Sequence, residues 1–476
     1  MISSITISGC LDVPSAELID FLPFKTGDSF KPDSVKLAGE ILTSFYNSLG
    51  YMDASVSSEV ETGEGTAAVF LTAMEGPRYF FGEITMEGLS SLRQEFLRKD
   101  IAFKRGEPYD SRKILETQGH LYGLGFFEDI TIRVSTTPAG TADVTVILKE
   151  KPMKWIKGGA GYGSEEKERF SLILTHNNFL RRAYKLELYN TLSRIWLEYK
   201  AEFMNRHFLG SATEYRNVVS WRKENRKGYD LENTKGIFSL GRKIALHSSG
   251  SVQYRMQRSV TYNVNPAIAE TTPSESQIRA LALTINRDTS DDPFFPARGS
   301  RSEMLLERSG GLIGGDVHFY RISANAAAYH RFHGRVIGAV SAKAGMVRET
   351  HPSAEVPVFE RYFAGGGNSV RGYAERDVGP KDSVGAPLGG NLLLSASSEL
   401  RFPLLGRLNG AVFVDAGQVG GHARMVLPSE WKYGAGGGLR YRTPVGPFRL
   451  DLGYKLNPDT GVSDFWHLHL SLGEAF

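Results

Sequence analysis

Between Met153 and the end of the chain, apolar and polar residues alternate with a period of two in one segment after another. The clearest runs are IWLEYKAEF at 195–203, FRLDLGYKL at 448–456 and WHLHLSL at 466–472. Successive side chains of a β-strand point to opposite faces, so each run gives its strand one apolar and one polar face. No amphipathic helix interrupts the series. The pattern predicts a β-sheet structure for these 324 residues.

A soluble β-sandwich also alternates in this way, so length has to decide between two architectures. A single sandwich of this size would be unusual, whereas a transmembrane barrel of about 16 strands allots about 20 residues to each strand and turn. The apolar faces also carry aromatic residues of the kind found at lipid interfaces, such as Tyr199, Phe203, Phe448 and Trp466. We therefore expect a transmembrane antiparallel β-barrel over 153–476.

Composition excludes several other classes of protein. The mean hydropathy is −0.25, and no stretch approaches the about 18 consecutive apolar residues of a membrane-spanning helix. The single cysteine, Cys10, excludes an intrachain disulfide and a thiolate metal cluster. A net charge of +3 is too small to predict a nucleic-acid surface. Residues 1–20 lack a basic segment followed by an apolar core, so we expect an exported form of this chain to be already processed.

The first 152 residues contain a tandem repeat at an offset of about 79 residues. ITISG at 5–9 corresponds to ITMEG at 84–88, and GDSF at 27–30 corresponds to GEPY at 106–109. Each unit reads as strand, helix, helix, strand, strand. The repeat predicts two α+β modules, at 1–76 and 77–152. The expected helices are 14–22, 32–49 and 111–122, and the expected later strands are 54–60, 67–74, 130–134 and 143–149.

A glycine-rich segment, ERYFAGGGNSVRGY at 360–373, is the most distinctive motif of the barrel region. Its glycines permit backbone conformations closed to other residues and let a loop pass close to a wall. Arg371 would need an acceptor to hold one position in an aqueous lumen, and a carboxylate binds a guanidinium with two hydrogen bonds. An ordinary surface turn with a solvated arginine explains the same spacing. The glycines are Gly365, Gly366, Gly367 and Gly372.

Two carboxylates face the predicted barrel interior. Asp415 shares a strand face with Phe413 and Gly417, opposite two valines, so it points inward if the valines contact lipid. Glu399 lies on the opposite face from Leu400 and would also point inward.

These motifs resemble the signature of the BamA/TamA-type superfamily of outer-membrane assembly and translocation proteins. The segment at 360–373 is similar to that family's Val-Arg-Gly-Tyr loop, which folds back into the barrel, and the stretches 287–299, 399–404 and 413–417 agree in order. The N-terminal modules are similar to POTRA modules, and the chain resembles the TamA-like members most. It has fewer modules than the BamA and TamA types usually carry, which implies a trimmed N-terminus or a shorter branch.

The resemblance also implies roles for individual residues. Val370, Arg371, Gly372 and Tyr373 would anchor the loop in the lumen. The arginine would pair with the carboxylate of the Phe-x-Asp-x-Gly strand, which is Asp415, with Glu399 as the second choice of partner.

The first predicted barrel strand is rich in glycine, which weakens a strand because it packs no side chain and loses more backbone entropy on folding. We expect a poorly hydrogen-bonded seam between this strand and the last strand, at about 463–472. An open seam exposes backbone groups that an incoming strand can pair with. Accommodation of barrel curvature is the alternative explanation for the glycines. The seam residues are Gly158, Gly159, Gly161 and Gly163, with Leu468, Leu470 and Phe476 opposite.

With the resemblance, these features favour an assembly factor in the outer membrane of a Gram-negative bacterium, with its POTRA modules in the periplasm. Its expected partners are the lipid bilayer, unfolded outer-membrane client proteins, and a periplasmic or inner-membrane protein at the POTRA modules. No nucleic acid, cofactor, metal or enzymatic activity is predicted. His467 and His469 share a strand face, but no third metal ligand is evident.

Two other functions stay open. A two-partner-type secretion pore would pass an extended exoprotein through the lumen, and two POTRA modules suit such a pore. Pores of that type usually begin with a plug helix, whereas this sequence begins at a strand. A passive porin would leave the periplasmic modules and the loop arginine without a purpose.

Overall fold

The computed structural model describes residues 1–472 except 11, 64, 333–334, 354, 384, 422–427, 444–445 and 460–462. The chain forms two compact units. The first comprises Met1–Met153 together with Asn177–Ala183, and the second comprises Lys154–His176 together with Tyr184–Phe476.

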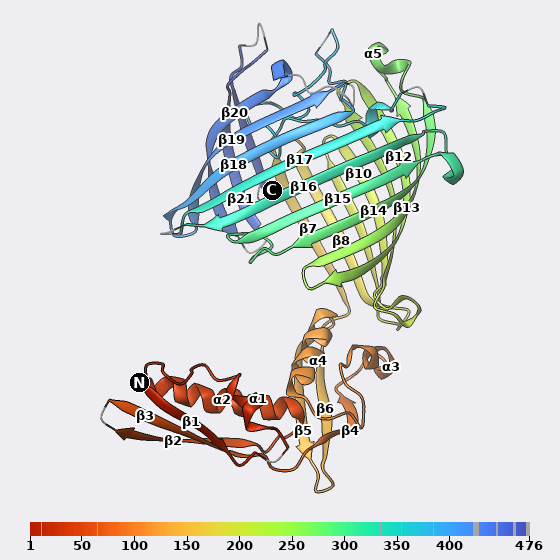
Figure 1. Cartoon of the computed structure of the whole chain (residues 1–476). Coiled ribbons are helices and arrows are strands. Elements are labelled where there is room, and N and C mark those ends of the chain that lie inside the picture. Colours follow the sequence, from red (N-terminus) through yellow and green to blue (C-terminus); the bar gives the residue numbers. More distant parts are fainter. Residues whose placement is uncertain are drawn as a thin grey trace. The chain divides into compact units, whose positions relative to one another are not determined.

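Both N-terminal repeats have the predicted order of elements, and each contains a three-stranded sheet (Figure 1). In each sheet the last strand of the repeat lies in the centre, parallel to the first strand and antiparallel to the second. The first repeat comprises β1 (Ile2–Ser8), α1 (Ser15–Ile19), α2 (Pro32–Leu49), β2 (Ser55–Gly63) and β3 (Thr66–Met74). The second comprises β4 (Phe80–Glu87), α3 (Gln94–Leu97), η1 (Arg98–Asp100), α4 (Ser111–Gly123), β5 (Phe127–Thr136) and β6 (Thr141–Glu150).

The longest helix of the first repeat illustrates how the sequence sets these elements. Pro32 occupies the first helical turn of α2, and Gly50 ends the helix in the left-handed conformation, with φ of 107°. Val35, Ala38 and Leu42 form the buried face. The first predicted helix is shorter than expected and ends at Ile19. Among the described residues, no helix combines the length and apolar composition needed to cross a membrane.

The two repeats share a tight turn after their first strand. Gly9 and Gly88, which the sequence repeat pairs, have φ of 78° and 81°. A Cβ atom at either position would lie 2.1 Å from a carbonyl oxygen of the central strand, that of Ala73 or Leu148. Only glycine fits so close to another backbone.

A glutamate at the end of each repeat accepts hydrogen bonds from the same turn. Glu75 accepts the amide of Asp12, at 3.1 Å. Glu150 accepts the amides of Ser91 and Leu92, each at 3.1 Å. Burial raises the pKa of Glu150, but the hydrogen bonds from Ser91, Leu92 and Ser90 outweigh it and lower the pKa to about 2.

The second unit is a 16-stranded antiparallel sheet that curls into a barrel, which confirms the predicted fold class (Figure 1). The predicted last strand begins three residues late, at Trp466, and Phe476 lies outside the described residues. The strands are β7 (Lys154–Gly163), β8 (Lys167–Phe179), β9 (Tyr184–Ser193), β10 (Trp196–Asn205), β11 (Glu214–Arg226), β12 (Tyr229–Ala245), β13 (Ser248–Tyr262), β14 (Glu275–Asp288), β15 (Gly299–Ser309), β16 (Phe319–Arg331), β17 (Ile337–Glu349), β18 (Leu392–Leu405), β19 (Leu408–Gly420), β20 (Lys432–Thr443), β21 (Gly446–Lys455) and β22 (Trp466–Leu472).

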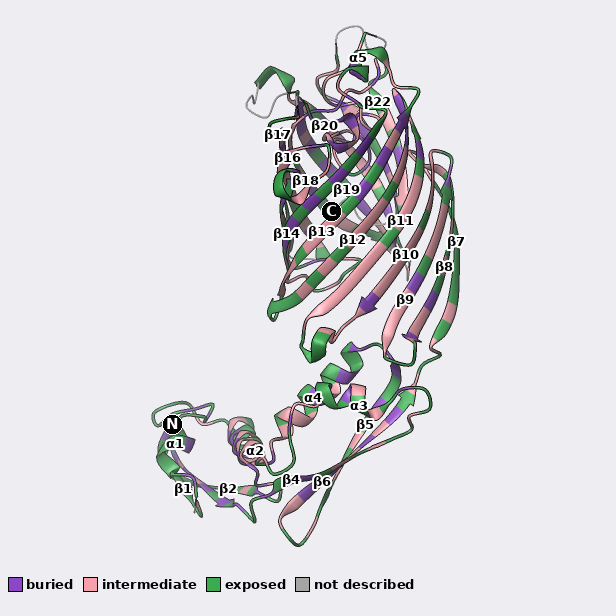
Figure 2. Ribbon diagram, turned by 90° about the vertical axis from the view of Figure 1, so that its right-hand side faces the viewer, coloured by how far each residue is buried: buried purple, intermediate pink, exposed green. Residues whose placement is uncertain are grey.

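The alternation of the sequence corresponds to the two faces of the barrel wall (Figure 2). On β21, Phe448 and Leu452 are exposed on the outer surface, whereas Arg449 and Asp451 are buried on the inner face. Because the chain enters the barrel at Lys154 and neighbouring strands are antiparallel, the loops that follow odd-numbered strands lie at the end distal to this entry. The loop 350–391, between β17 and β18, is one of these distal loops.

We predict that Gly88→Ala destabilises the second repeat more than Gly106→Ala does. Both glycines have left-handed φ values, 81° and 86°, but a Cβ at position 106 would meet no atom within 4 Å. The Gly106 variant therefore bears only conformational strain, about 1 kcal/mol, and the Gly88 variant adds a backbone clash. Urea unfolding of the full chain, followed by amide exchange in 80–150, measures the difference. Equal destabilisation would contradict this account of the turn.

Candidate functional site

The tip of the 350–391 loop lies against the inner wall formed by β19, β20 and β21. Val370 and Tyr373 are buried in a small apolar cluster with Val419. A Cβ at Gly453 would lie 1.7 Å from the carbonyl oxygen of Arg371, and one at Gly372 would lie 2.8 Å from the backbone of β21. The backbone of the loop therefore lies in direct contact with the backbone of the wall, and only glycine fits at these two positions.

Arg371 is buried, with 1% of its surface exposed, so the alternative of a solvated arginine in a surface turn is wrong. Its Nε and Nη2 atoms donate to the two carboxylate oxygens of Asp415, each at 2.8 Å. Its backbone amide donates to the same carboxylate at 3.0 Å. The guanidinium lies over the ring of Phe413, 3.4 Å from the centroid. A bidentate pair with a stacked ring fixes both the position and the plane of the side chain.

Further charged residues surround this pair. Arg371 Nη1 donates to Glu399 at 2.5 Å and lies 3.5 Å from a carboxylate oxygen of Asp451. Three more arginines neutralise these acids. Arg401 and Arg440 donate to Glu399, Arg440 also pairs with Asp451, and Arg449 Nε lies 3.5 Å from Asp451. We call this set the tip cluster: Arg371, Arg401, Arg440, Arg449, Glu399, Asp415 and Asp451. All seven side chains are buried, so each charge depends on the others for compensation.

A second set of buried charges holds the beginning of the same loop. Glu360, in η5 (Val358–Glu360), accepts from Arg255 on β13 at 2.8 Å and from Arg321 on β16 at 2.7 Å. Both arginines also bind Glu307 on β15, at 2.9 and 3.1 Å. Gln257 donates to Glu360 at 3.1 Å. We call these residues the stem cluster. The loop is thus attached to the wall at two separate places, on β13–β16 and on β18–β21.

Beyond the tip cluster, the loop contacts the two ends of the barrel sheet. The amide of Gly367 donates to Glu165, in the turn between β7 and β8, at 2.6 Å. Arg449 on β21 donates to the side chain of Asn368 at 2.7 Å. His469 on β22 is buried, and its Nδ1 lies 3.7 Å from Glu165. A cavity of about 330 Å³ separates these groups and is lined by β7, β22 and the loop.

The seam between β7 and β22 is sparsely hydrogen-bonded. Among the described residues, the two strands form no ladder with each other. Ser164, the residue after β7, donates its amide to the carbonyl oxygen of Leu470 at 3.2 Å, and the Leu470 amide donates to the Ser164 hydroxyl at 3.3 Å. The predicted seam glycines 158, 159, 161 and 163 all lie on β7, and Leu468 lies on the outer face of β22.

Sequence reasoning missed several of these residues. Asp451 and Arg449 were read only as members of an alternating strand, and Glu360 only as part of a motif. Gly453 carried a signal, because it is a glycine at an inward position between Asp451 and Lys455. Such a gap in a row of large inward side chains indicates that something else fills the space.

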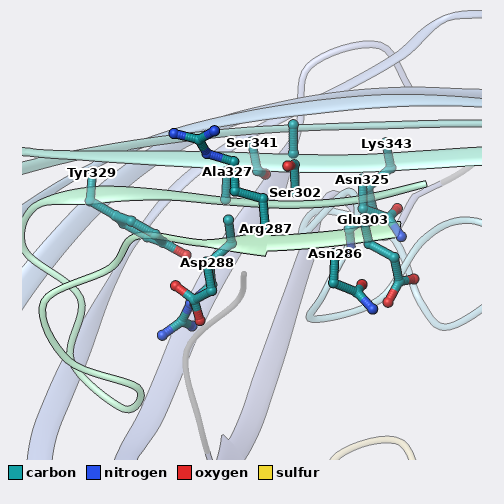
Figure 3. Close-up of a pocket in the computed structure, with 12 residues that line it drawn as sticks. Asn286, Arg287, Asp288, Ser302, Glu303, Asn325, Ala327, Tyr329, Ser341 and Lys343 are labelled. Atoms are coloured by element: carbon teal, nitrogen blue, oxygen red, sulfur yellow. The ribbon is translucent and has the colours of Figure 1, made fainter. Parts of the chain in front are cut away.

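A second hollow, of about 420 Å³, lies on β14–β17 (Figure 3). Asn286, Glu303, Asn325 and Lys343 form one row across its four strands. Lys343 connects this row to the loop, because its Nζ donates to the carbonyl oxygen of Asn368 at 2.9 Å. Within the described residues, no group of three or more His, Cys, Asp or Glu side chains is placed to hold a metal ion.

Comparison with known proteins agrees with this architecture. The Omp85 superfamily domain matches residues 178–476, and a POTRA family described as a surface antigen variable number repeat matches residues 1–73 and 79–151. The chain is 24% identical to the outer membrane protein assembly factor BamA of Nitratidesulfovibrio vulgaris, over 95% of this chain and 58% of that protein. The chain therefore spans less than two thirds of this relative's length.

Two solved structures have a similar fold. The structure of Haemophilus ducreyi BamA lacking POTRA domains 1–3 has a TM-score of 0.79 at 20% identity, with 98% of this chain and 97% of that chain covered. CdiB from Escherichia coli has a TM-score of 0.57 at 17% identity, with 98% and 89% covered. The TamA-like character stays a prediction from the sequence.

We predict that Arg371→Ala releases the loop tip, because it leaves three buried carboxylates short of a partner, at a cost of about 3–5 kcal/mol. Arg371→Lys keeps the charge but loses the bidentate hydrogen bonds to Asp415, so its effect should be intermediate. Amide hydrogen exchange over 365–373 in the folded full chain measures the release. Arg376→Ala is the control, since this arginine of the same loop is partly exposed. Unchanged exchange in the Arg371→Ala variant would show that the tip is held by other contacts.

We also predict that Glu165→Ala widens the seam, because it removes the acceptor of the Gly367 amide, a charge-assisted bond worth about 1.5–3 kcal/mol. Spin labels at the exposed positions Tyr162 and Leu468, in a Cys10→Ser background, report the distance across the seam. The distance distribution should gain a longer component. Glu166→Ala is the matched control, since Glu166 contacts Arg169 within its own hairpin. A distribution that is the same for both variants would mean that Glu165 does not hold the seam.

Proposed function

The chain belongs to the Omp85 superfamily, and from this premise we propose that it inserts other β-barrel proteins into the outer membrane through its seam. The observation that supports this proposal is the sparse hydrogen bonding of the seam. Within the described residues, β7 pairs with β8 along Lys154–Gly163, and its other edge faces β22, with a single backbone hydrogen bond just beyond the strand, at Ser164. The unpaired N–H and C=O groups of such an edge can bind an incoming strand.

This mechanism is not enzymatic. Main-chain hydrogen bonds formed by the client strand, and burial of its apolar face in lipid, supply the free energy without nucleotide hydrolysis. The relative from N. vulgaris is named an assembly factor, which supports the same role for this chain. Arg371 and its acidic partners would act by positioning the loop, and the loop in turn contacts the seam at Glu165.

We propose three functional modules, 1–76, 77–152 and 153–476. The barrel lies in the outer membrane, and the POTRA repeats lie in the periplasm. The edge strands of the repeat sheets are β1 and β2 in the first, and β4 and β5 in the second. These edges would receive extended segments of unfolded outer-membrane proteins, or of a periplasmic or inner-membrane partner, by strand addition.

A secretion pore is the second candidate, because two POTRA repeats suit such a pore. In that mechanism cargo passes through the lumen, so the seam can stay closed. The two functions therefore differ in whether a covalent link between β7 and β22 blocks activity.

We predict that a disulfide across the seam abolishes assembly activity. Ser164→Cys and Leu470→Cys, in a Cys10→Ser background, place the two thiols where the backbones already hydrogen-bond. The oxidised protein in liposomes should fold an unfolded outer-membrane barrel protein no faster than empty liposomes do, as followed by heat-modifiable gel mobility. A reductant should restore the rate.

The matched control joins two neighbouring strands that are already continuous. Ala342→Cys and Ala396→Cys are register partners on β17 and β18, so a disulfide there should leave the rate unchanged. If the seam-linked protein accelerates client folding as well as the reduced protein does, insertion through the seam is wrong. Large ion conductance without any acceleration would favour the secretion pore.

A further inference from the structure

The outer surface of the barrel carries a group of arginines at the distal ends of β14–β17. Arg308 on β15 is the register partner of Leu281 on β14 and of Tyr320 on β16, and Tyr320 is in turn the partner of Arg348 on β17. Arg279 lies on the same outer face as Leu281, one pair of residues nearer the distal end of β14. The three arginines, with Tyr320 between Arg308 and Arg348, thus form one band across four neighbouring strands.

Next to this band, toward the end at which the chain enters the barrel, the outer face of each strand becomes apolar. Leu281 follows Arg279 on β14, Leu306 precedes Arg308 on β15, Ile322 follows Tyr320 on β16, and Met346 precedes Arg348 on β17. Leu281, Leu306 and Ile322 are exposed at the barrel surface. On three of the four strands the outer face thus changes from aliphatic to cationic side chains toward the distal end, as expected near the boundary between the hydrocarbon and the headgroups of a bilayer.

The charges of this band are not neutralised within the protein. Among the described residues, Arg279, Arg308 and Arg348 form no ion pair, whereas Arg258 on the neighbouring β13 is paired with Glu275 at 2.7 Å. Arg308 Nη1 donates to the hydroxyl of Thr350 at 2.8 Å. The acid of the adjoining loop, Asp316, accepts the amide of Gln277 at 3.0 Å. The band is therefore a cationic surface with free donors.

A protruding turn lies between two of these arginines. The sequence GGLIGG at 310–315 has four glycines with positive φ, from 65° to 94°, around the single turn η3 (Gly311–Ile313). A Cβ at Gly314 would lie 3.3 Å from Arg279 Nη1, and one at Gly311 would lie 3.8 Å from Arg308 Nη2. Leu312, within the turn, is fully exposed. The glycine pairs thus present an apolar side chain to the exterior, beside two cations.

We propose that Arg279, Arg308, Arg348 and Leu312 bind the phosphate-bearing headgroup of a membrane lipid in the outer leaflet. Guanidinium groups match phosphate oxygens with two parallel hydrogen bonds, and the band follows directly on the aliphatic part of the outer face. The exposed leucine distinguishes a lipid from a soluble phosphate, because it gains free energy only from an apolar neighbour. The distal end is opposite the end at which the chain enters the barrel, at Lys154, so with the POTRA repeats in the periplasm it is the cell-surface end.

Native mass spectrometry of the full chain in a neutral detergent, titrated with a diphosphorylated glycolipid, tests the site. The double variant Arg279→Gln, Arg308→Gln should bind about tenfold more weakly than the unmodified chain. Leu312→Ser should weaken binding by roughly threefold while leaving all charges in place. Heat-modifiable gel mobility selects the folded protein for each comparison.

The matched control removes two outward arginines from other parts of the barrel surface. Arg242→Gln, Arg287→Gln, on β12 and β14 near the entry end, should leave the affinity within about twofold. An equal loss in this control would show that net charge alone attracts the lipid, and would overturn the proposal. Equal binding of the dephosphorylated glycolipid would also overturn it, and so would displacement of the glycolipid by an equimolar concentration of inorganic phosphate.

Discussion

The architecture of the barrel interior depends on one buried guanidinium. Arg371 lies in contact with three carboxylates, and a charge so removed from water is tolerated only when its partners are fixed in place. Those carboxylates need further arginines, and the loop backbone that carries Arg371 needs Gly453 on the wall. Burial of the Arg371 side chain thus depends on residues of four strands, β18–β21.

The same loop is held at its stem by Glu360, which pairs with arginines of β13 and β16. Between these two attachments it contacts the first hairpin through Glu165 and the next-to-last strand through Arg449. The loop is therefore a mechanical connection between the seam and the interior of the wall. A displacement of the first hairpin would move Gly367, which lies four residues from the buried arginine.

Much of this could be predicted from the sequence, because it depends on local periodicity. The alternating strands gave the barrel and its inward face, and that parity placed Asp415 and Glu399 on the correct side of the wall. Asp451 and Glu360 were not predicted as partners, since their roles depend on which strands become neighbours of the folded loop. The band at Arg279, Arg308 and Arg348 was missed for a related reason. These residues are distant in sequence, and only the register of β14–β17 brings them near one another on the outer face.

The order of strands has a consequence for how the barrel can move. In the series from β7 to β22, strands β14–β17 are near the midpoint, so the lipid-binding arginines lie across the circumference from the seam. The stem cluster attaches the loop to the same side. Lipid headgroups and the loop would hold the strands of this side of the barrel in place. The strands on the side of the seam would then be the ones that can move. Opening would then be a one-sided deflection of the strands next to β7 and β22, with the far arc as the fixed support.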